Sequence, residues 1–186
     1  MPSRHPVPRR WLFVDDRLGN GLWCALRRLP PGSGVVFRAR DRAGEARYVR
    51  VRRIARARRL VLLSADSKRA GAAGVHNGLG PGLRSRSVHD RRELLAARRA
   101  IADLIFVSPV FATRSHPEAA VLGPHGFAWL ARGSAIPVIA LGGMTERRWR
   151  RLPDAHGWAG IDAWVGSSGQ RTLTALSGAR PQEIEP

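Results

Sequence analysis

Two segments in the second half of the chain carry residue types that could bind an anion. In the first, the apolar run Leu104–Val107 is followed by hydroxyl and basic side chains, namely Ser108, Thr113, Arg114, Ser115 and His116. In the second, the apolar run Pro137–Leu141 is followed by Gly142–Gly143. Hydroxyl and basic groups donate to oxyanions, and glycine lets a phosphate reach backbone N–H groups. The two segments therefore predict an anion-binding site at the ends of two buried strands.

A third segment, near the N-terminus, places arginines at alternate positions. Arg38, Arg40 and Arg42 follow the apolar start of the run Gly34–Arg38. In an extended chain, alternate residues share one side, so three guanidinium groups could point together. The histidine that ends the run Ala73–His76 is as compatible with a buried structural role as with a functional one.

Strands and helices that alternate along the chain must position these segments. We expect strands at Trp11–Val14, Gly34–Arg38, Leu60–Leu63, Ala73–His76, Leu83–Val88, Leu104–Val107, Pro137–Leu141 and Ala159–Val165. We expect helices at Gly21–Leu29, Gly44–Arg59, Arg91–Ala102, Gly126–Arg132 and Glu146–Leu152. This alternation predicts an α/β fold, a compact (β/α)8 TIM barrel. Asn77–Gly82 holds only turn residues and is too short for a crossover helix, so the connections are shortened, especially after the fourth strand.

Length and composition indicate one globular domain. The 186 residues suffice for one substantial core, and we expect a basic N-terminal extension at 1–10, the barrel at 11–179 and a tail at 180–186. The formal net charge of +18 is unusual, but Lys68 is the only lysine among 32 basic residues. Such an excess of arginine, spread over several segments, indicates a coding bias and a solvated surface, which disfavours nucleic-acid binding. The single cysteine, Cys24, and the lack of a long apolar run predict a cytoplasmic protein without a membrane span.

Five motifs, in order, resemble the thiamine phosphate synthase and TenI family, a group of small phosphate-binding barrels. They are RARDR (38–42) for the family's Gln-x-Arg-Glu-Lys, AAGVH (72–76) for Ala-Asp-Gly-Val-His, SVH (87–89) for Ser-x-His, SPVFAT (108–113) for Gly-Pro-Val-Phe-x-Thr, and PVIALGG (137–143) for a nearly identical segment. The resemblance covers roughly residues 11–166. It implies the same barrel and an enzyme of thiamine biosynthesis.

The resemblance also implies roles for individual residues. Thr113, Ser115, Gly142 and Gly143 would hold the phosphate of a thiazole phosphate, and Arg38, Arg40 and Arg42 would bind a pyrimidine pyrophosphate. Ser87 and His89 would lie on the barrel floor between the two substrates, and His116 stands where the synthase has a loop lysine. The reaction expected of a synthase joins hydroxymethylpyrimidine pyrophosphate to thiazole phosphate and releases pyrophosphate. The partners would be small phosphorylated substrates, while the oligomeric state is left open.

The family's metal-binding carboxylates are mostly absent, which leaves other functions open. Of the acidic groups that would ligate Mg²⁺, only Asp66 has a counterpart here, and no organic cofactor is implied. A TenI-like thiazole tautomerase would need a general acid and base but no metal, and His116 or His89 would have to serve because Pro109 stands where that family has its catalytic histidine. A catalytically degenerate barrel that only binds a phosphate ligand is the third alternative.

Overall fold

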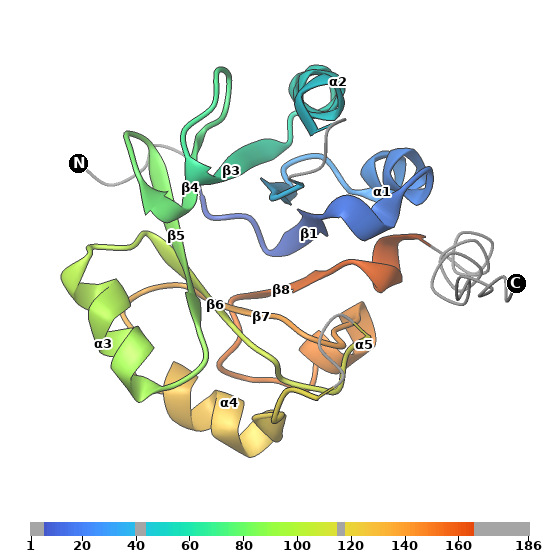
Figure 1. Ribbon diagram of the computed structural model, residues 1–186. Helices are drawn as coiled ribbons and strands as arrows, with labels where there is room; N and C mark the ends of the chain where they lie inside the picture. The colour runs from blue at the N-terminus through green and yellow to red at the C-terminus, as the bar shows by residue number, and fades with distance from the viewer. Residues whose placement is uncertain (1–5, 40–43, 115–117, 166–186) are drawn as a thin grey trace, which may run out of the picture.

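Eight parallel strands form a closed barrel in sequence order (Figure 1). The computed structural model describes residues 6–39, 44–114 and 118–165. The strands are β1 Arg10–Val14, β2 Gly34–Phe37, β3 Val61–Ser67, β4 Gly74–Leu79, β5 Leu83–Val88, β6 Leu104–Val107, β7 Val138–Ala140 and β8 Gly157–Gly160. The barrel closes where β1 pairs with β8, with Trp11 opposite Ala159. The predicted compact TIM barrel is confirmed.

Helices follow only some of the strands. They are α1 Gly21–Arg28 after β1, α2 Gly44–Ala57 after β2, α3 Arg91–Arg99 after β5, α4 Gly123–Ala131 after β6 and α5 Glu146–Trp149 after β7. A 3₁₀ turn, η1, lies at Asp16–Leu18, and residues 162–165 after β8 are also helical. No helix follows β4, as predicted, and the connection consists of residues 80–82. The connection from β3 to β4, residues 68–73, also lacks a helix, and the sequence analysis expected none between Leu63 and Ala73. None of the helices in the described part of the chain combines the length and the apolar character of a membrane span.

The short return from β4 to β5 depends on a glycine. Gly82 has a φ of +92°, and a Cβ at this position would lie 2.1 Å from the carbonyl oxygen of Ala73. The next amide, that of Leu83, donates to the same oxygen at 3.0 Å. A side chain at position 82 would therefore collide with the backbone against which the turn closes. Turn residues replace a crossover helix here because the chain folds back directly along β4.

Alternate residues of the strands fill two separate cores. Trp11 and Phe13 of β1 point into the barrel, where each ring meets the edge of Phe106, with centroids 5.3 Å and 4.9 Å apart. Leu12 and Val14 of the same strand pack between the barrel and its helices. This two-residue period is typical of a barrel that is packed inside and covered outside. These aromatic rings fill the interior of the barrel, beneath the loops that follow the strands.

The predicted eighth strand, Ala159–Val165, is wrong in its position. The strand ends at Gly160, and residues 162–165 are helical. Trp164 stacks on Trp158 with ring centroids 4.8 Å apart, and its Nε1 donates to the carbonyl oxygen of Trp11 at 3.0 Å. The apolar run continues past the strand because this helical turn is buried against the outside of the barrel. Apolar character alone does not distinguish the two conformations.

Candidate active site

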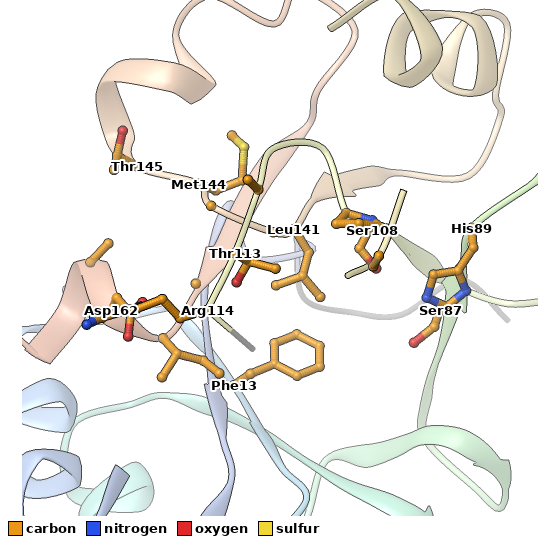
Figure 2. Close-up of a pocket in the computed structure, with 18 of the residues that line it drawn as sticks. Phe13, Ser87, His89, Ser108, Thr113, Arg114, Leu141, Met144, Thr145 and Asp162 are labelled. Atoms are coloured by element: carbon orange, nitrogen blue, oxygen red, sulfur yellow. Dashed lines mark hydrogen bonds and ion pairs between the residues drawn. The ribbon is translucent and has the colours of Figure 1, made fainter. Parts of the chain in front are cut away.

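A cavity of about 1040 Å³ opens at the carboxyl ends of the barrel strands. It is lined by residues that five different strands deliver: Arg38 after β2, Ser87 at the end of β5, Thr113 after β6, Gly143 after β7 and Asp162 after β8. In the view of Figure 2, Ser87 and His89 lie across the cavity from Arg114 and Asp162. Because parallel strands end at the same edge, the topology gathers these distant residues in one place.

The glycine pair after β7 is pressed against the loop after β6. The amide of Val110 donates to the carbonyl oxygen of Leu141 at 2.9 Å, and that of Phe111 donates to Gly142 at 3.1 Å. Both glycines have left-handed φ values, +92° for Gly142 and +59° for Gly143. A Cβ on Gly143 would lie 2.5 Å from the carbonyl oxygen of Ala112. The pair is therefore required by loop packing as well as by any ligand that approaches its backbone.

The backbone after β7 offers hydrogen-bond donors to the cavity. Gly142, Gly143 and Met144 line it, and no hydrogen bond within residues 6–39, 44–114 and 118–165 uses their amide N–H groups. Successive N–H groups of this kind form a concavity that suits an anion. We call these three residues the cradle. Thr113, on the facing loop, lines the same part of the cavity.

The short helix α5, which follows the cradle, is anchored to β1 and β8 where the barrel closes. Thr145 is its N-cap and accepts a hydrogen bond from the amide of Arg148 at 3.2 Å. Glu146 forms an ion pair of 2.7 Å with Arg10 and accepts a hydrogen bond of 3.0 Å from Nε1 of Trp158. The hydrogen bond from Arg10 holds the pKa of Glu146 below its ordinary value. These contacts fix the start of α5 and therefore the backbone of the cradle.

Ser87 is held by a polar network at the end of β4 and β5. Its Oγ lies 3.3 Å from Nε2 of His76 and accepts a hydrogen bond of 3.1 Å from the side-chain amide of Asn77. Its backbone amide donates to Oδ1 of Asn77 at 2.8 Å. Asn77 adopts a φ of +55°, a conformation that asparagine tolerates well. The hydroxyl of Ser87 is thus fixed at the wall of the cavity.

His76 lies beneath Ser87 and is buried among aromatic rings. Its Nδ1 is 2.9 Å from Oγ of the buried Ser85, and its ring meets the edges of Phe13 and Phe106. Burial, reinforced by the charge of Arg38, lowers the pKa of His76 from 6.5 to about 4. The imidazole is therefore neutral near pH 7. The structure gives His76 a supporting contact with Ser87 but no place on the cavity lining.

Arg38 is the predicted substrate-binding arginine that the structure places in the cavity. Its Nη2 lies 3.4 Å from Oδ2 of the buried Asp15, and its guanidinium lies over the ring of Phe13 at 5.4 Å. Asp15, which directly follows β1, also forms an ion pair with Arg17 and therefore contacts two arginines. Arg40 and Arg42 lie outside the described residues, and their shared role with Arg38 stays a prediction.

Of the three predicted catalytic residues, Ser87 and His89 line the cavity. His89 is tied to Glu93, whose Oε2 lies 2.8 Å from its Nδ1 and accepts its backbone N–H at 2.7 Å. Glu93 in turn belongs to the N-terminal turn of α3, where Asp90 caps its amide at 2.8 Å. The contact between His89 and Glu93 therefore also stabilises the N-terminus of α3. His116 and Ser115 lie outside the described residues.

The described residues do not supply a fitting Mg²⁺ site. Asp66 is an exposed residue of β3 with a φ of +63°, and it does not line the cavity. Within the described ranges, no three acidic, histidine or cysteine side chains come together closely enough to hold a metal. Mg²⁺ prefers several oxygen ligands. Among the described residues, the two carboxylates that line the cavity are Glu118 and Asp162, and Asp162 is paired with Arg114.

Sequence reasoning missed Asn77 and Asp162. Asn77 was assigned to a turn, and its contact with Ser87 depends on a pairing of β4 with β5 that no local pattern reveals. Asp162 was placed inside an expected strand, although it follows β8 at the edge where the other functional residues gather. Its position directly after a strand of a parallel barrel was the signal that could have identified it.

The second half of the chain matches a known protein family. A profile described as thiamine monophosphate synthase matches residues 82–165, which run from the start of β5 to the helical turn after β8. A protein of Aquifex aeolicus named as a second thiamine-phosphate synthase is 36% identical over 84 residues, 42% of this chain and 44% of the relative. A thiamine-phosphate synthase of a Synechococcus strain is 41% identical over 70 residues, 36% of this chain and 19% of the relative. The matches thus span less than half the length of these curated relatives.

A solved structure extends the similarity to the whole barrel. Thiamine phosphate pyrophosphorylase from Pyrococcus furiosus superposes with a TM-score of 0.68 at 20% identity, over 92% of this chain and 97% of that chain. At this identity the superposition shows the fold alone. Residues 82–165, which include the cradle, are therefore similar in sequence to thiamine monophosphate synthases, and the whole barrel is similar in fold to a thiamine phosphate pyrophosphorylase.

Proposed function

We propose that the protein is a thiamine phosphate synthase-like transferase, which joins hydroxymethylpyrimidine pyrophosphate to thiazole phosphate and releases pyrophosphate. The observation that carries the proposal is the cradle: Gly142, Gly143 and Met144 line the cavity, no hydrogen bond within the described residues uses their amide N–H groups, and they lie in the segment that matches the family. A cavity of about 1040 Å³ is large enough for two small substrates.

The proposed reaction divides the cavity between two anionic groups. The cradle and the hydroxyl of Thr113 would hold the phosphate of the thiazole, and Arg38 would attract the pyrophosphate of the pyrimidine. The bond between the pyrimidine methylene carbon and the pyrophosphate oxygen breaks, and its electron pair leaves with pyrophosphate. The thiazole nitrogen then donates its lone pair to that carbon.

This chemistry asks the site for charge stabilisation and orientation rather than for proton transfer. A neutral His76 that holds the Ser87 hydroxyl suits that requirement. We therefore give Ser87 an orienting role at the pyrimidine. Because the described donors do not fit Mg²⁺, we derive no step through a metal.

The test is direct formation of product. Purified protein is mixed with hydroxymethylpyrimidine pyrophosphate and thiazole phosphate, with and without Mg²⁺, and thiamine phosphate is measured by mass spectrometry. We expect the unaltered protein to form thiamine phosphate. Arg38→Gln, which keeps a polar side chain but removes the charge, should lower turnover at least about tenfold. Complete absence of thiamine phosphate under both conditions refutes the proposal.

A thiazole tautomerase is a second candidate because of one contact. The Nδ1 of His89 lies 2.8 Å from the carboxylate of Glu93, and His89 lines the cavity. A histidine–carboxylate pair can move a proton. The contact already has a structural explanation in the start of α3, so we rank this activity second. Two results together would reverse the ranking. The protein would exchange a proton of the thiazole phosphate carboxylate with solvent, an activity lost in His89→Gln, and it would form no thiamine phosphate.

A further inference from the structure

An ion pair spans the rim of the cavity between the loop after β6 and the residues after β8. Arg114 donates through Nε to Oδ2 of Asp162 at 3.2 Å, and its Nη2 is also 3.2 Å from that oxygen. Figure 2 shows the two side chains next to each other at the cavity. Their side chains are 57% and 42% exposed, so solvent reaches the pair.

This pair adjoins the proposed phosphate cradle. Ala112, two residues before Arg114, approaches Gly143 so closely that a Cβ there would lie 2.5 Å from its carbonyl oxygen. On the other side, a Cβ on Gly160 would lie 3.5 Å from the carbonyl oxygen of Met144 and 3.8 Å from the Cβ of Ala163. Asp162 stands between Gly160 and Ala163 in the sequence. The loops after β6, β7 and β8 therefore meet at one place, and the ion pair joins two of them.

The charges at this place conflict with the binding of a dianion. Arg114 and Arg38 are the arginines on the described cavity lining, and Arg38 has Asp15 beside it. A phosphate in the cradle would draw Arg114 toward itself, because guanidinium groups bind phosphate strongly. Asp162 holds the same guanidinium. Once Arg114 had turned to the phosphate, the carboxylate of Asp162 would stand unpaired near a second anion.

We propose that Asp162 sets the strength and the charge selectivity of phosphate binding by competing with the ligand for Arg114. The proposal rests on the proposed function only in taking the cradle as the phosphate site. It assigns Asp162 the role of a specificity residue: a monoanion is accepted more readily than a dianion, since the second charge is the one that the carboxylate opposes. Release of the phosphorylated product is favoured for the same reason, because Asp162 recaptures Arg114 as the anion leaves.

The expected effect follows from the exposure of the pair. Exposed ion pairs are worth up to roughly a fivefold change in an equilibrium constant, and salt screens them. Asp162→Asn keeps the shape of the side chain while it frees Arg114 and removes the opposing charge. We expect this variant to bind a phosphate ester about three- to tenfold more tightly than the unaltered protein at low salt, with the difference shrinking as salt is added.

The experiment uses calorimetric titration of the full chain with thiazole phosphate and with inorganic phosphate, near pH 8 and at two salt concentrations. Glu118→Gln is the matched control, because Glu118 is the other carboxylate on the described cavity lining and no ion pair joins it to Arg114. It removes the same charge from the same cavity and should change the dissociation constant by less than about twofold. Asp162→Ser serves as a second variant, so that a folding defect of one substitution does not decide the result.

Each outcome is informative. Tighter binding in Asp162→Asn but not in Glu118→Gln supports the proposal, and the gain should shrink when Arg114→Gln is added. Equal tightening in both variants would show a long-range charge effect and overturn it, as would unchanged or weaker binding in both Asp162 variants. The proposed function is tested separately, by product formation. If phosphate binds and Asp162→Asn binds it more tightly, but no thiamine phosphate forms, the competition for Arg114 is supported and the synthase reaction is refuted. No binding of either probe by any protein would overturn the cradle and the competition together.

Discussion

Acidification should unfold the protein partly through His76. Burial, reinforced by Arg38, lowers the pKa of this side chain to about 4, whereas the ordinary value of 6.5 applies to the unfolded chain. Between these values the unfolded state binds more protons than the folded state does. The neutral histidine therefore costs the fold nothing above the unfolded pKa, and stability falls as the pH drops from 6.5 toward 4.

The size of the effect follows from the same two values. At about pH 5 the unfolded histidine is almost fully protonated and the folded one mostly neutral, so the free energy of unfolding should fall by about 2 kcal/mol relative to neutral pH. His76→Gln removes the titration but keeps polar atoms near Ser85 and Ser87. Carboxylates that are paired in the fold, such as Glu146, lose their contribution only at lower pH and do so in both proteins.

The assay is urea unfolding, followed by tryptophan fluorescence, at neutral pH and at about pH 5. The unaltered protein should lose about 2 kcal/mol more between the two pH values than His76→Gln does. The chemical shift of the His76 ring, followed by NMR through the same range, gives its pKa directly. A His76 that titrates near 6.5, or equal acid losses in the two proteins, would refute the reasoning.

Three further predictions concern the backbone of the site. Gly143→Ala should lower the free energy of unfolding by roughly 1–3 kcal/mol, and by more than Gly133→Ala, which has a similar φ of +66° but open space around it; equal melting temperatures for the two variants would contradict this. Asn77→Gly keeps the left-handed backbone but removes two hydrogen bonds to Ser87, so urea unfolding should show a loss of about 1–2 kcal/mol, and an unchanged midpoint would count against the network. Thr145→Ala removes the N-cap of α5 and should cost about 1 kcal/mol, which Thr145→Ser should largely restore in thermal unfolding.

The barrel could be predicted because its signals are local. The buried run Leu104–Val107 and the alternating run Leu83–Val88 appear in the structure with the bounds that the sequence predicts. The turn residues after β4 correctly predicted a crossover without a helix. Ala159–Val165 was assigned to a strand because burial looks the same in both conformations.

The site was harder to predict because its contacts join distant residues. The position of Gly142–Gly143 and Thr113 on the cavity could be predicted because all three follow strands of a parallel barrel, while their role in phosphate binding stays a prediction. The burial that keeps His76 neutral comes from Phe13 and Phe106, which belong to two other strands. No pattern around residue 76 contains that information.

The two connections without helices, residues 68–73 and 80–82, have a consequence for how the chain folds. They make β3, β4 and β5 the strands of this barrel that pair across the shortest stretches of chain. Small loops lose little entropy on closure, and contacts between near neighbours in sequence form quickly. We therefore expect the transition state for folding to contain β3–β5 already paired. The closing contact between β1 and β8, which joins residues from opposite ends of the described chain, should form last.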